Sequence, residues 1–213
     1  MRNRDVQPLL ILFLAFVLPG CGSSTKAKYA SGVPALDVDP TVKGPVSGVG
    51  IEAHDISAMT DTMMRDLLRV PELASREKAP RVIVDDSDFR NEGSQPINRK
   101  LIVNKLRTAL ARSAKGRMKF LGREFADSVE KERQLKRDGV TDIGTTGLTK
   151  AHFGADYKMT GTIATLDSYS AATGLQQRYT QITFEMLDLE SGELIWSNQY
   201  ELQRAAADDV SYR

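Results

Sequence analysis

The stretch ITFEMLDLESGELIWSNQYEL, residues 182–202, is the most informative about the fold. Apolar and polar side chains alternate on both sides of a short loop; the apolar positions are Ile182, Phe184, Met186, Leu194, Trp196, Tyr200 and Leu202. A period of two is typical of half-buried strands. The loop Glu190-Ser191-Gly192 places glycine where a tight turn needs a positive φ. The stretch therefore predicts an antiparallel β-hairpin.

The same alternation begins earlier in the chain. Tyr157, Met159 and Ile163 alternate with polar residues, which adds a third strand and predicts an antiparallel meander. Further upstream, residues 81–85 (RVIVD) and 118–121 form short apolar runs that are typical of strands.

Helical spacing predicts four helices: one before the first strand, one between the first two strands and two before the meander. Residues 56–70 would start at an N-cap on Asp55 or Ser57 and stop at Pro71, and a second helix would have Pro96 at its first position and Lys115-Gly116 at its end. The charged segment 125–137 is expected on the surface, and 146–152 is expected as a short helix capped by Gly154.

This order of elements fixes the fold class. A strand–helix–strand unit favours a parallel pair with a right-handed crossover, whereas a meander is antiparallel. We expect an α/β (mixed) fold: one mixed parallel/antiparallel sheet of about five strands with packed helices, after a disordered linker.

The amino-terminal residues have the three parts of a secretory signal. Arg2 and Arg4 precede an apolar run at 9–18, and the last residue of this run begins the sequence Leu18, Pro19, Gly20 and Cys21. The last four residues resemble the lipobox of bacterial lipoproteins, in which the cysteine receives the lipid. We expect residues 1–20 to be the signal peptide and Cys21 to be the lipid attachment site; the alternative is an ordinary cleaved signal followed by a chance cysteine.

Residues 21–50 are expected to be a lipidated flexible linker. Pro34, Pro40 and Pro45 and several glycines interrupt any helical or strand period there. Residues 51–213 would then form one globular α/β domain.

Composition excludes some classes of partner. The chain has 29 Lys and Arg against 28 Asp and Glu, so no basic excess is available for nucleic acid. Its single cysteine leaves no disulfide within the chain.

No pattern in the sequence predicts a catalytic site, a metal site or a cofactor. His54 and His152 lack the spacing of zinc ligands and are interpreted as surface or cap residues. Asp85, Asp86 and Asp88 are interpreted as a polar turn at a strand end, with a cation site as the alternative. The glycine clusters at 44–50 and 144–147 lack the context of a nucleotide or phosphate loop. Three methionines at helical spacing are expected in the core rather than in a partner groove: Met59, Met63 and Met64.

Several segments together resemble the penicillin-binding protein activator LpoB family. They are, in chain order, residues 55–60 (DISAMT), 80–84 (PRVIV), 105–110 (KLRTAL), 154–157 (GADY), Thr160-Gly161 and 188–196 (DLESGELIW). The resemblance implies that residues 51–213 are an LpoB-like domain with a TolB N-terminal-like fold. It further implies a lipoprotein on the periplasmic face of the outer membrane that is not an enzyme, binds a class A (bifunctional) penicillin-binding protein and stimulates peptidoglycan synthesis. No small-molecule substrate is expected.

Two other functions remain open at this stage. One is a structural or assembly lipoprotein of the cell envelope in a TolB-like or secretion-associated complex, and the other is an enzyme such as a peptidoglycan hydrolase. The residues that contact a partner are not placed by any motif.

Overall fold

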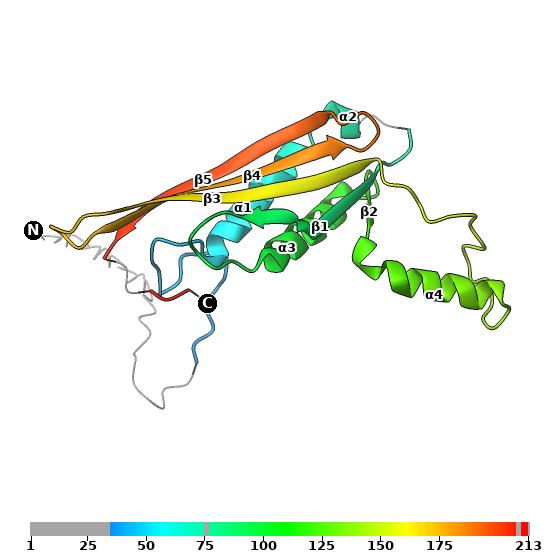
Figure 1. Cartoon of the computed structure of the whole chain (residues 1–213), viewed down its shortest axis with the longest axis horizontal. Helices are drawn as coiled ribbons and strands as arrows, with labels where there is room; N and C mark the ends of the chain where they lie inside the picture. The colour runs from blue at the N-terminus through cyan, green and yellow to red at the C-terminus, as the bar shows by residue number, and fades with distance from the viewer. Residues whose placement is uncertain (1–34, 75–76, 208–209, 213) are drawn as a thin grey trace, which may run out of the picture. The chain divides into compact units, whose positions relative to one another are not determined.

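A five-stranded mixed sheet in the order β2-β1-β3-β4-β5 is the centre of the fold (Figure 1). Its strands are β1 (Arg81–Asn91), β2 (Lys119–Leu121), β3 (Tyr157–Tyr169), β4 (Gln176–Asp188) and β5 (Leu194–Ala206). β1 pairs in parallel with β2 and β3, while β3, β4 and β5 are antiparallel. The computed structural model describes residues 35–74, 77–207 and 210–212. The expected α/β fold with one mixed sheet is confirmed.

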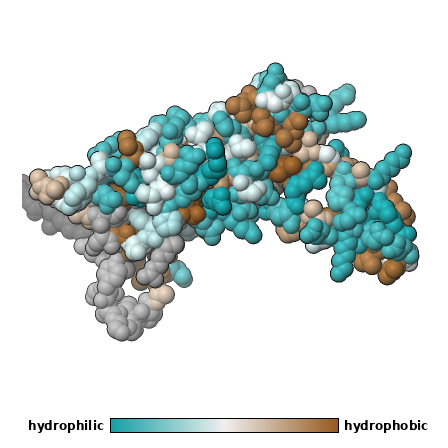
Figure 2. Space-filling model, in the orientation of Figure 1, coloured by the Kyte–Doolittle hydropathy of each residue, from teal (hydrophilic) through white to brown (hydrophobic). Residues whose placement is uncertain are grey.

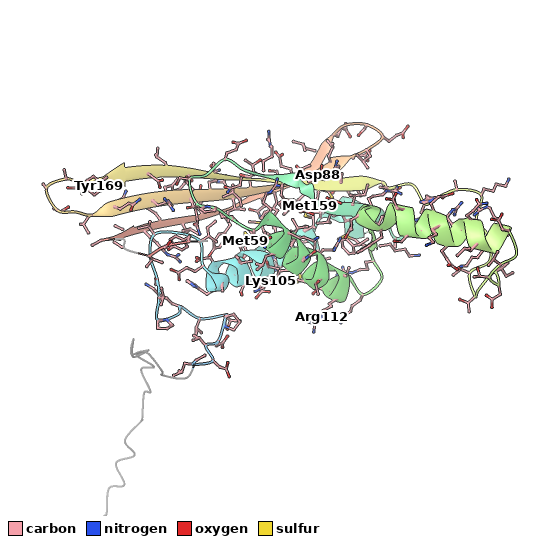
Figure 3. The ribbon with its side chains drawn as sticks, turned by 60° about the horizontal axis from the view of Figure 1, so that its bottom comes forward. Met59, Asp88, Lys105, Arg112, Met159 and Tyr169 are labelled. Carbon is pink, nitrogen blue, oxygen red and sulfur yellow. The ribbon has the colours of Figure 1, made fainter. Side chains whose placement is uncertain are left out.

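The meander strands are longer than the apolar alternation predicted. β3 and β4 stay in register from Tyr157↔Asp188 to Tyr169↔Gln176. From Leu166 onward the side chains of β3 are exposed, and Tyr169 lies at the far end of the hairpin (Figure 3). The buried residues of β4 in this part, Arg178 and Thr180, are polar. Backbone pairing therefore continues where the sequence has no apolar alternation.

Helices α1 (Ala53–Leu67) and α3 (Arg99–Ala114) cover one face of the sheet (Figure 1). Met59 of α1 and Met159 of β3 are both buried in the layer between helices and sheet (Figure 3). Met63 is also buried, and Met64 packs against the core from a partly buried position. The assignment of these methionines to the core is confirmed.

The predicted helix starts were wrong by a few residues. Glu52 is the N-cap of α1, because its backbone N–H donates to the Asp55 carboxylate at 2.8 Å in a capping box. Arg99, not Pro96, is the first residue of α3, and its N-cap is Asn98, whose side chain accepts the N–H of Leu101 at 3.2 Å. Pro71 opens the short helix α2 (Pro71–Ala74).

The predicted end of the second helix is confirmed. α3 stops at Ala114, after which Lys115 has a φ of 48° and Gly116 a φ of 84°. Left-handed residues of this kind end helices because they turn the chain away from the helical path.

The acidic run after Val84 is not a turn, which corrects the interpretation of Asp85, Asp86 and Asp88. β1 continues to Asn91, and its register with β3 shifts between Val84 and Phe89. The irregular segment leaves the ladder and returns with Phe89 opposite Gly161 and buried. Because β3 provides pairing partners for β1 beyond the irregularity, Asp85, Asp86 and Asp88 lie within a strand, although aspartate is common in turns.

Between β2 and β3 lie the helix η1 (Arg123–Phe125) and the helix α4 (Ala126–Arg137). No residue of α4 is buried, so the expectation of a charged surface helix is confirmed. The short helix expected at 146–152 does not form, and this prediction was wrong. The reason lies in how α4 holds that segment.

Candidate partner-binding surface

Residues 122–155, here called the arm, carry a set of exposed apolar side chains (Figure 2). Each is between 44% and 70% exposed: Phe125, Val129, Val140, Ile143, Leu148 and Phe153. The buried core cluster of the described residues contains no residue of the arm. Apolar side chains that gather at the surface and do not serve the core mark interaction sites.

Arginine side chains hold the segment after α4 in an irregular path. The Arg133 guanidinium donates to Thr149 Oγ1 at 2.8 Å and to the Thr149 carbonyl at 3.3 Å, and Arg137 donates to that carbonyl at 2.7 Å. Arg123 donates to the Phe153 carbonyl at 2.8 Å. These bonds fix residues 149–153 in a non-helical path beside α4 and η1.

Between α4 and this segment lies a groove with a volume of about 580 Å³. Its apolar lining comes from both walls: Leu121, Ala126, Val129, Leu148 and Phe153. Its charged lining consists of Arg123, Arg133, Lys136 and Arg137. The volume is within the range of about 300–1,000 Å³ that is usual for ligand pockets.

The groove has a positive lining. Among the described residues that line it there are four Lys or Arg side chains and no carboxylate. Glu130, which is outside the lining, lies 2.8 Å from His152 Nε2. The hydrogen bond with His152 lowers the pKa of Glu130, so this carboxylate remains ionised at the edge of the groove.

Phe153 joins the arm to the sheet. The guanidinium of Arg81, the first residue of β1, lies 4.2 Å from the centre of the Phe153 ring. This cation–π contact and the bond from Arg123 to the Phe153 carbonyl position the groove wall next to β1.

The histidines singled out in the sequence have different surroundings. His54 lies at the start of α1 between Glu52 and Asp55, with Arg204 donating to Asp55 at 2.6 Å. His152 lines the groove. Neither is part of a metal-binding group, since no cluster of three His, Cys, Asp or Glu able to hold an ion exists among the described residues.

The acidic residues of β1 are engaged in local contacts. Asp85 accepts the backbone N–H of Ser87 at 3.0 Å, and this bond lowers its pKa. Asp88 forms an ion pair with Lys158 at 2.6 Å. These contacts stabilise the irregular part of the strand.

Cys21 and the lipobox residues Leu18, Pro19 and Gly20 lie outside the described residues. Gly48, Val49 and Gly50, at the end of the expected linker, are buried. The Gly50 N–H donates to Tyr212 Oη at 2.9 Å, and its carbonyl accepts from Arg204 at 2.6 Å. The packed part of the chain thus includes these three residues.

Sequence reasoning missed the groove. Its only signal was the presence of large apolar residues without strand or helix period in a highly charged segment, from Val129 to Phe153. Their side chains form a surface only because Arg133 and Arg137 bring residues 146–153 back onto α4.

A family model described as peptidoglycan-synthase activator LpoB matches residues 55–202, more than half of the 213-residue chain. The chain belongs to the LpoB family. The match runs from the first turn of α1 to the middle of β5 and includes the whole arm.

Solved structures similar to this LpoB family member include two LpoB domains. The LpoB C-terminal domain from Salmonella enterica is 18% identical, with 70% of this chain and 99% of that chain covered and a TM-score of 0.41. The Escherichia coli LpoB C-terminal domain is 13% identical, with coverages of 67% and 96% and a TM-score of 0.38. Lipoprotein GNA1162 from Neisseria meningitidis is 15% identical, with coverages of 62% and 88% and a TM-score of 0.34. No curated protein matches the chain.

The segments that carried the LpoB resemblance serve the fold. Asp156 accepts the backbone N–H of Arg81 at 2.7 Å and so ties β3 to β1. Asp188 accepts the N–H groups of Glu190 and Ser191 at 2.8 and 3.0 Å, which closes the β4–β5 turn. In these two segments, Asp156 and Asp188 therefore stabilise the sheet and its turn.

Within the described part of the chain, no helix has the length and apolarity that a membrane span requires.

Proposed function

We propose that this protein is a lipid-anchored regulator on the periplasmic face of the outer membrane that binds and activates a class A penicillin-binding protein. The observation that carries the proposal is the LpoB family match over residues 55–202. The exposed apolar side chains of the arm support it, since they supply a surface suited to a protein partner.

Activation of this kind needs no chemistry in the regulator. A protein that binds the active conformation of a synthase more tightly than the inactive one shifts the population toward activity. A tenfold difference in affinity corresponds to about 1.4 kcal/mol of coupling. The regulator therefore needs a surface that distinguishes two conformations of its partner.

The proposed anchor and linker set where the domain can act. Lipid attached at Cys21 would hold the chain at the membrane, and the residues from 22 to the buried Gly48 would separate the two. At about 3.3–3.6 Å per residue, roughly 26 residues reach at most about 90 Å. The domain would thus stay within about 90 Å of its membrane and could meet a partner inside that distance.

The test of the proposal is a binding titration. The mature chain, residues 21–213 in detergent micelles, is titrated against each class A synthase of the same organism. Saturable binding to at least one synthase is expected. Absence of binding to all of them would refute the proposal.

The linker favours a second candidate function. Fewer than thirty residues between Cys21 and Gly50 suit a module that stays near its membrane, as in an envelope assembly complex. Deletion of residues 26–43 separates the two functions in cells. Loss of synthase activation with a stable, membrane-bound protein supports the activator, and an unchanged phenotype supports the assembly role.

A further inference from the structure

We propose that the groove of the arm receives a segment of the partner synthase that places apolar side chains next to a carboxylate. This inference rests on the proposed function and adds the contact surface and the chemistry of the contacting segment. The occupant is one stretch of protein chain, with the apolar part against Val129 and Leu148 and the acid toward Lys136.

The arm has no role in the core that would explain its apolar residues. It spans residues 122–155, between β2 and β3, and contributes none of the described buried residues around Met59 and Met159. The arm has its own helix, α4, and arginine side chains of α4 hold the following segment beside it. The exposed apolar residues therefore belong to a surface built by side-chain contacts within the arm.

The apolar side chains of the groove lie on both of its walls. Val129 on α4 and Leu148 on the opposite wall are 44% and 55% exposed, and Phe153, 56% exposed, lies between the groove and β1. A side chain inserted here would be covered by both walls and would remove all three residues from water. Burial of such residues is favourable in proportion to the apolar area that leaves water.

The charge of the lining selects an acidic partner. Arg133 and Arg137 donate to backbone carbonyls, which orients their guanidinium groups, and the Nε of Arg133 lies 3.5 Å from the Glu130 carboxylate. Glu130 is outside the lining, so the lining itself keeps an excess of positive charge. Among the described residues, Lys136 has only Glu132, at 3.8 Å and outside the lining, as an ion-pair partner. A carboxylate at the groove would therefore gain charge-assisted bonds, whereas a basic segment would be repelled.

The occupant is a protein segment rather than a phosphate-rich polymer. The groove combines apolar walls with four cationic side chains. The chain as a whole has a net charge of only +1. Binding to a phosphate backbone requires many cations along a track. An anionic lipid surface is kept as an outcome of the test.

The experiment measures Kd between the mature chain, residues 21–213, and a class A synthase of the same organism. The test variants are Lys136→Glu and Leu148→Asp, which both change residues of the groove lining that lie outside the core. The matched controls are Lys131→Glu, an exposed lysine on the same helix outside the groove lining, and Leu166→Asp on the exposed part of β3.

Each test variant is expected to raise Kd at least about tenfold, and the controls less than about twofold. Added salt should weaken wild-type binding and have less effect on Lys136→Glu, because the screened attraction is already lost. Circular dichroism confirms that every variant is folded.

Three other results would overturn the inference. Equal Kd for wild type and both test variants would refute the groove while leaving the proposed function intact. No binding of wild type to any class A synthase would refute the proposed function and, with it, this occupant. Binding of the Cys21→Ala chain, which lacks the proposed lipid, to anionic vesicles that Lys136→Glu abolishes, without synthase binding, would assign the groove to lipid.

Discussion

Replacement of Gly161 by alanine should destabilise the protein. This is unusual, because glycine normally weakens a strand and its replacement would be expected to stabilise it. A Cβ atom at this position would lie 2.5 and 2.6 Å from two ring atoms of Phe89 and 3.2 Å from the Thr183 carbonyl oxygen. Phe89 cannot move aside easily, because it is 2% exposed and its ring centre lies 5.4 Å from that of Phe184.

Two opposing effects set the magnitude. Removal of glycine from the unfolded chain stabilises by about 0.4–1 kcal/mol. Overpacking of a well-packed core costs about 1–3 kcal/mol. The clash is with a buried ring and with backbone, so the second effect dominates and a net loss of about 1–2 kcal/mol in the free energy of unfolding is expected.

The assay is urea denaturation of the mature chain, monitored by circular dichroism. Gly154→Ala is the matched control, because a Cβ atom at Gly154 would meet no described heavy atom within 4 Å and Gly154 has no positive φ. The control should be neutral or slightly more stable. Equal stabilisation by both substitutions would refute the claim that the Phe89 ring requires glycine at position 161.

Three further predictions concern the sheet, the hairpin and the anchor. Asp66→Ala should lower the free energy of unfolding in urea by about 1–3 kcal/mol. Trp196, which is 8% exposed, donates from Nε1 to Asp66 at 2.8 Å and would lose this acceptor. An unchanged urea midpoint would contradict this prediction. The hydrogen bond from Arg178 lowers the pKa of Asp167, so its stabilisation is complete above the unfolded pKa of about 4 and is lost as pH falls through the lower folded value. Asp167→Asn should therefore flatten the fall in thermal midpoint below about pH 4, and a curve parallel to wild type would argue against it. Cys21→Ala should move the protein from the membrane fraction to the soluble fraction on immunoblots; continued sedimentation with membranes would exclude the lipid anchor.

The sheet could be predicted from the sequence wherever burial imposes a period of two. β4 and β5 follow the alternation around Phe184 and Trp196, and the parallel β1–β2 pair follows from the strand–helix–strand order. The far half of the β3–β4 hairpin has no apolar alternation, because β3 is exposed from Leu166 onward and the buried residues of β4 there, Arg178 and Thr180, are polar.

The continuation of β1 and the loss of the helix at 146–152 depend on partners far away in the sequence. Local propensity favours a turn at Asp85 and Asp86, but pairing with β3 continues the strand to Asn91. Likewise, arginines of α4 fix the path of the segment that follows, as Arg137 does by donating to the Thr149 carbonyl. These contacts are not visible in a local pattern.

The same difference between local pattern and distant contact applies to the candidate site. The groove needs two segments of the arm to meet, so the residues that line it were not placed by any motif. Cys21 was predicted from a local motif and stays a prediction.

Activation itself is tested by the rate of glycan-strand synthesis and crosslinking by a class A synthase as the mature chain is added. We predict a rise in rate that saturates at the concentrations where binding saturates. The Lys136→Glu variant should need a higher concentration to reach half of this rise, whereas Lys131→Glu should need the same concentration as wild type. An unchanged rate when the synthase is fully bound would contradict the proposed function.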